Sequence, residues 1–416
     1  MDPNVALLFY STLYVVLSIL VSKIVENFTS EFVARKLLHI LVGNAVLLPV
    51  ILKADLWSTA LVPLAFIFVN HILQEIGVFE AQTGLIFYPF SILLLVFLSY
   101  LTSNPLYLII PSLVMAYGDG VAALCGRLIF HREEKSLEGS IIMFLVSLAI
   151  SGLFFALFDI NPVWALIIAT VATVAESERD DNLTVPLYTA IALNAVYVPL
   201  KMLVEGFGIS LILSSIAYYL NILTIGGLVG AVVLGSVSFA ISPPIFLSLL
   251  LFLLSSSFLT KYRKRKKDLK NYQKSGKRDG FQVLANGFAP AFALSMMVSG
   301  IDALPFAIAS IAAATADTWA TEIGVLSRRR PLLITSFEEV EPGRSGGITP
   351  LGLFATLLGG FFIFLTLYPF LGLSAFSPSI IGAVVGSLID SLLGATIQGS
   401  YLCRVCGRLT EKSKHC

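Results

Sequence analysis

Long apolar runs constrain this chain more than any other feature of its sequence. Runs of about 20 mostly apolar residues recur along its whole length, and a helix of that length spans the hydrocarbon core of a bilayer. Hydrophobic residues make up 57% of the 416 residues and charged residues only 13%, about half of the share usual in soluble proteins. This composition excludes a water-soluble enzyme, a disordered scaffold and a small secreted disulfide domain.

We therefore expect an all-α polytopic membrane protein with about fifteen transmembrane helices in two fused helical bundles. The expected helices are 4–24, 35–52, 56–73, 84–102, 105–126, 140–158, 162–176, 183–203, 208–222, 223–240, 242–259, 280–300, 303–326, 348–369 and 377–400. The first lacks a basic flank and a small-residue cleavage site, so we expect a retained helix and not a signal peptide. The expected domains are 1–205 and 206–416, and the second contains a cytoplasmic basic loop at 260–279.

The distribution of basic residues predicts the sidedness of these helices. If the N-terminus lies outside, 25 of the 27 Lys and Arg residues fall in loops or a tail on the inner face, and only Lys53 and Lys201 lie outside. Lys and Arg concentrate in cytoplasmic loops of membrane proteins, so we expect polar sites to face the cytoplasm. The basic run 261–270 is typical of an anchor that contacts anionic lipid headgroups. Nucleotide binding is its alternative interpretation.

A carboxylate inside an apolar helix is costly and tends to mark function, and Asp119 is the clearest case. It lies between Gly118 and Gly120, near the predicted cytoplasmic end of its helix. Glycine on both sides would let a phosphate or a metal ion approach the backbone closely. In the loop that follows, Lys135 supplies a point charge for phosphate. Ser136 and Ser140 flank the start of the next helix, where free N–H groups favour an anion.

Two further carboxylates fall in the next cytoplasmic loop. Glu176 ends one helix and Asp181 begins the next, although helix capping is an equally good explanation for the neighbouring Asp180. Carboxylate oxygens hold Mg²⁺, usually together with substrate phosphates. Asp119, Glu176 and Asp181, converging with Arg127 and Lys135, are therefore typical of phosphoryl transfer. The sequence has no Walker loop, kinase glycine loop or Rossmann fingerprint.

His39 is a further candidate because it lies one turn from Arg35. Its alternative role is an ordinary hydrogen bond between helices. The segments 35–44 and 278–287 each place a basic residue at a cytoplasmic helix start, which suggests two similar active sites in tandem. Chance resemblance between apolar helices is the rival explanation.

The second half repeats this style of polar residue in apolar helices. Asp317 and Glu322 share one expected helix, and Asp390 interrupts another. The segment Gly343–Gly347 is a candidate phosphate cradle or a plain turn. Near the C-terminus, Cys403, Cys406, His415 and Cys416 predict either a tetrahedral Zn²⁺ site or free thiols.

These motifs resemble two families of membrane enzymes. The N-terminal half, about 5–203, resembles the CTP-dependent lipid-alcohol kinases, namely dolichol kinase, phytol kinase and the yeast-type diacylglycerol kinase. The resemblance is carried by Arg35 to His39, Gly118 to Ala123, Gly126-Arg127, Lys135 to Ser140, Glu176 and Asp181 to Pro186. It implies that Asp119, Glu176 and Asp181 bind Mg²⁺ and activate the hydroxyl, and that Arg35 and His39 orient the acceptor. The implied nucleotide-binding residues are Arg35, Arg127, Lys135, Ser136, Gly139, Ser140 and Asn182.

The C-terminal half, about 208–416, resembles the phytyl-phosphate kinase and transmembrane protein 19 family. That resemblance is carried by Arg278 to Gly287, Ala316 to Gly324, Ser345 to Gly347 and Asp390 to Thr396. It implies a second site with Asp317, Glu322 and Asp390 for metal, and with Arg278, Asn286, Ser345, Gly346 and Gly347 for phosphate.

Together the two resemblances imply a fused salvage enzyme for isoprenoid alcohols such as phytol, geranylgeraniol or a polyprenol. The first half would make the monophosphate and the second the diphosphate, while the lipid intermediate stays in the bilayer. The implied co-substrate is CTP or another nucleoside triphosphate, and no nucleic-acid partner is expected. One alternative is a CDP-lipid synthase, and another is a secondary transporter, whose repeated halves and midplane acids are similar. The acids here lie near cytoplasmic helix ends, which disfavours the transporter.

Overall fold

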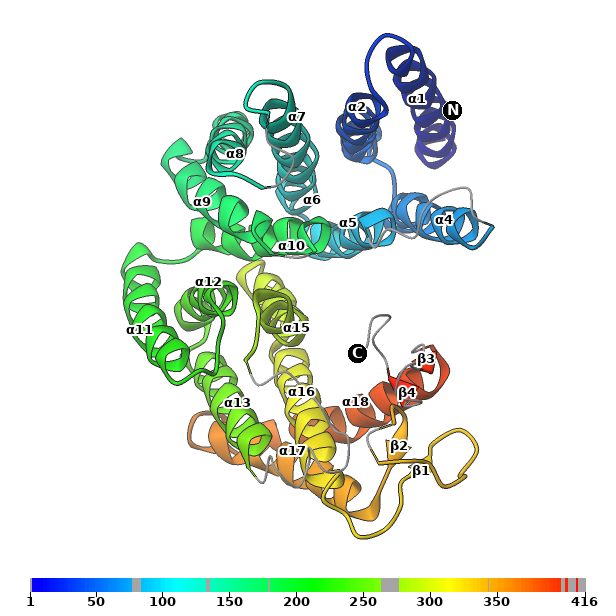
Figure 1. The fold of residues 1–416 in the computed structure, drawn as a ribbon. Coiled ribbons are helices and arrows are strands. Elements are labelled where there is room, and N and C mark those ends of the chain that lie inside the picture. Colours follow the sequence, from blue (N-terminus) through cyan, green and yellow to red (C-terminus); the bar gives the residue numbers. More distant parts are fainter. Residues whose placement is uncertain are drawn as a thin grey trace. The chain divides into compact units, whose positions relative to one another are not determined.

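The computed structural model describes residues 2–76, 84–131, 135–178, 180–262, 277–342, 344–397, 401–402 and 409–410. Almost all regular structure in them is helical (Figure 1). Nine of the described helical segments are long and apolar enough to cross a membrane, and three shorter apolar helices accompany them. The chain is thus an all-α membrane protein, as predicted. The number of about fifteen crossings and the two fused bundles stay predictions.

The chain divides into two compact units, which are described separately. Unit 1 comprises Met1–Ile241 and Lys277–Asp302, and unit 2 comprises Ser242–Gly276 and Ala303–Cys416. Helices α11, α12 and α15 therefore pack with the preceding helices, so the compact units do not follow the predicted sequence boundary at residue 205. The two sequence domains stay a prediction.

Unit 1 contains thirteen α-helices among the described residues. They are α1 Pro3–Glu26, α2 Glu31–Gly43, α3 Leu48–Leu52, α4 Leu56–Glu75, α5 Gly84–Leu101, α6 Leu106–Leu113, α7 Gly120–Leu128, α8 Leu137–Leu157, α9 Ala165–Glu176, α10 Asp181–Leu193, α11 Leu200–Tyr219, α12 Ile225–Ile241 and α15 Gly280–Val298. Short 3₁₀ turns occupy Asn44–Leu47, Pro162–Trp164 and Asn194–Tyr197, and a π-helical turn occupies Val114–Asp119.

The core of unit 1 is centred on α6 and α10. Every residue of α6 is buried, as is every residue of α10 from Thr184 to Leu193. A helix that is apolar on all sides is covered by other helices on all sides. Two polar side chains in this core are paired: the Tyr107 hydroxyl donates to Asn194 Oδ1 (2.8 Å), and the Asn194 amide donates to Ser295 Oγ (2.9 Å). The buried hydroxyls of Ser112 and Thr189 have no hydrogen-bond partner among the described residues. The core therefore gives the surrounding helix ends fixed positions.

The helix expected at 183–203 is two elements in the structure. Helix α10 ends at Leu193, a 3₁₀ turn follows, and α11 begins at Leu200. Pro199 is the physical reason, because a proline disfavours helical backbone in the residue before it. Val198 accordingly has an extended backbone, with φ −114° and ψ 154°. The prediction joined two apolar stretches and overlooked this break.

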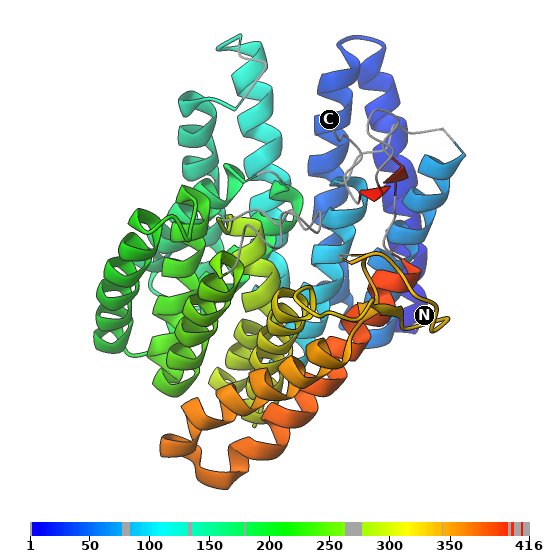
Figure 2. The same ribbon diagram turned by 60° about the horizontal axis from the view of Figure 1, so that its bottom comes forward.

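Unit 2 contains α13 Pro243–Lys261, α16 Leu304–Gly324, α17 Pro350–Leu371 and α18 Phe376–Thr396, with a 3₁₀ turn at Gly372–Ala375. Helices α16, α17 and α18 pack against one another, and α13 packs against α16 and α17 (Figure 2). Two antiparallel ribbons complete the described part. Strands β1 Leu332–Leu333 and β2 Gly347–Ile348 pair with Leu332 opposite Ile348, and β3 Tyr401–Leu402 pairs with β4 Leu409–Thr410.

Candidate functional site

A cluster of charged side chains in unit 1 forms the candidate site. Its members come from the middle of α2, the junction before α7, the loop before α8, the end of α9 and the start of α10. They are Lys36, His39, Asp119, Lys135, Glu176 and Asp181. The predicted cytoplasmic loops at these helix ends thus meet on one side of unit 1. That this side faces the cytoplasm stays a prediction.

Asp119 lies at the centre of the cluster and ends the π-helical turn Val114–Asp119. Such turns insert an extra residue into a helix and occur frequently at functional sites. Asp119 Oδ2 accepts a hydrogen bond from Lys36 Nζ at 2.7 Å and lies 3.9 Å from His39 Nε2. The His39 ring also contacts Tyr88, with ring centroids 4.8 Å apart. The carboxylate is thus held between a lysine and a histidine of α2.

The glycines beside Asp119 pack helices together, which corrects the expectation that they admit a ligand. A Cβ on Gly118 would collide with Met143 Sδ of α8, and a Cβ on Gly120 would lie 2.5 Å from Ile40 Cγ1 of α2. The space that glycine leaves is therefore filled by neighbouring side chains. Close packing of α2 and α8 around the Asp119 segment explains both glycines.

We therefore expect Gly120→Ala to destabilise the protein by about 1–3 kcal/mol, because Ile40 must move to admit the methyl group. Gly126→Ala is the matched control on the same helix, since nothing lies within 4 Å of a Cβ there. Alanine should be neutral at that position or stabilise α7 by up to about 1 kcal/mol. Thermal unfolding in detergent measures both variants. Equal melting temperatures for the two would contradict the packing explanation.

Lys135 forms hydrogen bonds with several residues of the segment that joins α9 to α10. Its Nζ donates to the carbonyl oxygen of Glu176, to the carbonyl oxygen of Glu178 (3.2 Å) and to Asp181 Oδ2 (2.9 Å). The Lys135 side chain is nevertheless 49% exposed. Asp181 Oδ1 also accepts from the Asn182 amide (3.1 Å). The ammonium already donates to three oxygens, so it could bind an anionic ligand from outside by exchanging one of these contacts.

Two buried polar atoms of the cluster have no hydrogen-bond partner: Glu176 Oε2 and His39 Nε2. Glu176 is 7% exposed, and its carboxylate lies within electrostatic range of Lys135, Asp119, Asp181 and Lys36. Buried polar atoms without partners are rare and call for an explanation, such as a ligand.

The expected Mg²⁺ ligands Asp119, Glu176 and Asp181 share this cluster but do not form a ready metal site. Within the described residues, no group of three or more His, Cys, Asp or Glu side chains is arranged to hold a metal ion. Lys36 and Lys135 occupy one oxygen each of Asp119 and Asp181. Mg²⁺ often takes only one or two carboxylates and completes its shell with water and phosphate. Magnesium binding therefore stays a prediction.

For several other predicted residues the structure shows exposure or contacts with groups other than the charged side chains of the cluster, and their roles stay predictions. Arg35 is exposed, and its neighbour Lys36 contacts Asp119 instead. The Arg127 guanidinium lies 4.5 Å from the centre of the Phe32 ring, a cation–π contact. Ser136 caps α8 by accepting from the Gly139 N–H at 3.2 Å. Ser140 lies in the first turn of α8, where its own N–H donates to the Ser136 carbonyl oxygen.

Lys36 was missed because the sequence offers two basic residues near His39. Arg35 lies four residues before His39 and Lys36 lies three before it, and both spacings place side chains on one helix face. Only the orientation of α2 against α7 decides between them.

This choice gives a paired test. Lys36→Met should reduce turnover about ten- to a hundredfold, because charge-assisted hydrogen bonds contribute about 1.5–3 kcal/mol. Arg35→Met, the matched control, should change turnover less than about threefold. Steady-state rates of both variants, with the activity proposed below, provide the measurement. A larger loss of turnover in Arg35→Met than in Lys36→Met would show that Arg35, the residue predicted from the sequence, has the functional role.

The residues expected to form a second site are divided between the two units. Arg278 and Asn286 lie in unit 1, where the Arg278 N–H donates to the Ile222 carbonyl oxygen (2.8 Å). Asp317, Glu322 and Asp390 lie in unit 2. Glu322 is 1% exposed, and its Oε1 accepts from Thr260 Oγ1 at 2.7 Å, whereas Asp390 is exposed on α18.

The segment 345–347 is shaped by packing in unit 2. Gly346 has φ +78°, and a Cβ there would lie 2.5 Å from Ala395 Cβ. The Gly347 N–H donates to the Arg344 carbonyl oxygen, and the Gly346 carbonyl accepts from Ile334. The turn is therefore explained without a phosphate, and a phosphate-binding role for Ser345, Gly346 and Gly347 stays a prediction. Cys403, Cys406, His415 and Cys416 lie outside the described residues, and so does the basic run 261–270 beyond residue 262.

The fold and the cluster define a class, that of polytopic helical membrane proteins with a charged site at their helix ends. The chain belongs to the integral membrane protein DUF92 family, whose model matches residues 208–416. No solved structure is significantly similar to it.

Three curated proteins are similar to parts of the chain. It is 43% identical over 118 residues to an uncharacterised membrane protein of Methanocaldococcus jannaschii, covering 28% of this chain and half of that protein's length. It is 34% identical over 203 residues to protein PGR of Arabidopsis thaliana, covering 39% and 68% of the two chains. It is also 33% identical over 184 residues to a phytol kinase of Synechocystis sp., and this match covers 38% of this chain and 77% of that protein's length.

Proposed function

We propose that the protein is a membrane lipid-alcohol kinase and that the cluster around Asp119 is its active site. The observation that carries this proposal is the meeting of Lys36, Lys135 and three carboxylates at the ends of apolar helices, with Glu176 Oε2 left without a partner. Phosphoryl transfer depends mainly on positioning and on neutralising phosphate charge. The similarity to a phytol kinase supports the same reaction class.

The chemistry of the carboxylates suits a magnesium ion, although they are not arranged as a ready metal site in the described residues. Asp119, Glu176 and Asp181 would hold the ion through oxygen, the ligand atom that Mg²⁺ prefers. When bound with the nucleotide, Mg²⁺ would neutralise charge on the phosphates. Lys135 and Lys36 would add positive charge beside it, as each ammonium exchanges a carboxylate contact for a phosphate oxygen.

Glu176 is the best placed base for the lipid hydroxyl. The hydroxyl oxygen attacks the γ-phosphorus, and the new O–P bond forms as the bond to the leaving nucleoside diphosphate breaks. The diphosphate leaves with the electron pair, and Glu176 Oε2 takes the hydroxyl proton. His39 would orient the acceptor hydroxyl through Nε2, which also lacks a partner. The lipid tail would remain between apolar helices.

We further propose that the alcohol is an isoprenoid and the donor CTP or another nucleoside triphosphate, as the resemblance of the N-terminal half implies. The finer proposal of a second step, from monophosphate to diphosphate, rests on the resemblance of the C-terminal half. Glu322 is its most distinctive residue, because a carboxylate that is 1% exposed in a membrane helix is costly.

Labelled nucleotides test the proposal against a CDP-lipid synthase. Purified full-length protein is incubated with phytol or geranylgeraniol, Mg²⁺, and CTP or ATP carrying label in either the α- or the γ-phosphate. The kinase transfers γ-label to lipid, whereas the synthase transfers α-label and releases pyrophosphate. Label in a lipid diphosphate that disappears in Asp317→Ala would support the second step. The absence of label in lipid with either nucleotide would refute the kinase and favour a transporter.

A further inference from the structure

Glu178 joins the candidate site to helices that the sequence analysis did not connect with it. It follows Glu176 in the loop between α9 and α10, and its carbonyl oxygen accepts from Lys135 Nζ at 3.2 Å. Its side chain reaches the start of α15, where its carboxylate lies beside Gly280 and is stabilised by the backbone N–H groups of Gly280 and Phe281. The first N–H groups of a helix have no partner within the helix, so a carboxylate there is stabilised.

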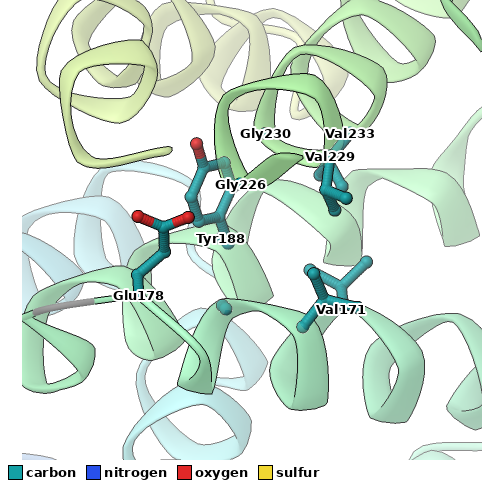
Figure 3. Close-up of a pocket in the computed structure, with 9 residues that line it drawn as sticks. Val171, Glu178, Tyr188, Gly226, Val229, Gly230 and Val233 are labelled. Atoms are coloured by element: carbon teal, nitrogen blue, oxygen red, sulfur yellow. The ribbon is translucent and has the colours of Figure 1, made fainter. Parts of the chain in front are cut away.

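Two glycines of α12 make room for this contact. Gly226 and Gly230 lie one turn apart, and we call them the glycine notch. A Cβ on Gly226 would overlap Glu178 Oε1, and a Cβ on Gly230 would overlap the Tyr188 hydroxyl. Figure 3 shows the Glu178 carboxylate and the Tyr188 ring beside the helix that carries the notch. Glu178, Tyr188 and the glycine notch line a small cavity of about 10 Å³. A cavity of this volume holds about one water molecule.

The start of α15 is itself firmly held. The Tyr188 hydroxyl donates to the Gly280 carbonyl oxygen at 2.8 Å, and the Asp279 side chain caps the helix by accepting from the Gln282 N–H at 2.8 Å. The Thr224 N–H donates to the Arg278 carbonyl oxygen at 2.9 Å. The anchor that Glu178 contacts is therefore fixed by side chains and backbone from α10, α12 and α15.

We propose that Glu178 is a positioning residue that fixes Lys135. Its side chain ties the loop to the glycine notch and to the start of α15, and its carbonyl helps to hold the Lys135 ammonium. The inference rests on the proposed function in naming nucleotide phosphate as the group that Lys135 meets. Helices α12 and α15 lie within the segment 208–416 that matches the family model. They would therefore complete a site formed by the preceding helices.

Amine labelling tests the positioning without relying on turnover. Purified protein is treated briefly with an acylating reagent, and the modified fraction of Lys135 is measured by mass spectrometry, with exposed Lys201 as internal reference. Glu178→Ala frees the loop and Gly226→Ala displaces the carboxylate, so both should accelerate Lys135 labelling severalfold. Gly208→Ala, where nothing lies within 4 Å of a Cβ, should leave it unchanged. Unchanged Lys135 labelling in both site variants overturns the proposal.

Kinetics then separate positioning from general stability. Glu178→Ala should raise the KM for the nucleotide about tenfold, with little change in the KM for the lipid alcohol. Glu178→Gln keeps an acceptor oxygen beside Gly226 and Gly280 but loses the charge, so its KM for the nucleotide should lie between those of wild type and Glu178→Ala. An equal increase in the KM for the nucleotide and in the KM for the lipid alcohol would indicate a structural role only. An inactive wild type would refute the kinase, whereas the labelling result would still decide whether Glu178 positions Lys135.

Discussion

Glu176→Gln should lower kcat about 10²- to 10⁴-fold, the range typical for loss of a general base. Glutamine keeps the size of the side chain but cannot take the hydroxyl proton. Glu176 Oε2 is buried without a hydrogen-bond partner, so its oxygen is available to accept the proton. The KM for the nucleotide should change much less, because Lys135 contacts the backbone carbonyl of Glu176, which the substitution retains.

Glu205→Gln is the matched control. This carboxylate lies on α11, exposed to solvent, with Lys201 Nζ 3.9 Å away. It should retain wild-type kcat and the wild-type melting temperature. A Glu176→Gln variant that turns over at nearly the wild-type rate would show that the proton leaves by another group.

Asp119→Asn should lower kcat/KM by roughly 10²- to 10³-fold, the usual effect of removing one preorganised electrostatic group. The substitution removes the charge that holds Lys36 Nζ at 2.7 Å and that His39 Nε2 faces at 3.9 Å. The Lys36 ammonium would then stand in a partly buried site without its carboxylate partner, which disfavours its charged form. Both the proposed phosphate contact and the proposed metal ligand would be impaired together.

The control for this variant is Asp159→Asn. Asp159 is exposed after α8 and has φ +56°, a conformation that asparagine adopts readily. It should behave as wild type in rate and in thermal unfolding. If Asp119→Asn kept full activity while Asp159→Asn did too, Asp119 would have no role in the reaction.

Much of the site could be predicted because charges are rare in this sequence. Asp119, Lys135, Glu176 and Asp181 stand out against apolar helices, and the positive-inside pattern placed their loops on one side. In the structure these four residues share one cluster.

Residues whose role depends on packing could not be assigned in the same way. The sequence cannot tell whether Gly118 and Gly120 face a ligand or a neighbouring helix, and the structure shows Met143 and Ile40 beside them. The choice of Lys36 over Arg35 depends on the rotation of α2.

Contacts between segments far apart in the sequence were also beyond prediction. The role proposed for Glu178 depends on its contact with the start of α15, which lies about a hundred residues later in the sequence. The break before α11 was readable from Pro199, since proline restricts the residue before it. In the second half, Arg278 and Asn286 fall in a different compact unit from Asp317 and Glu322. Neighbouring motifs along a chain need not fold into one unit.

Transfer of γ-phosphate label to an isoprenoid alcohol tests the central claim most directly. Wild-type protein, Asp119→Asn and Asp159→Asn are purified in the same detergent and incubated with geranylgeraniol, Mg²⁺ and γ-labelled CTP or ATP. We predict labelled lipid monophosphate from the wild type and from Asp159→Asn, with one nucleoside diphosphate released per label transferred, and at least a hundredfold less from Asp119→Asn. Label transferred equally by all three proteins, or by none of them, would contradict a lipid-alcohol kinase built on the Asp119 cluster.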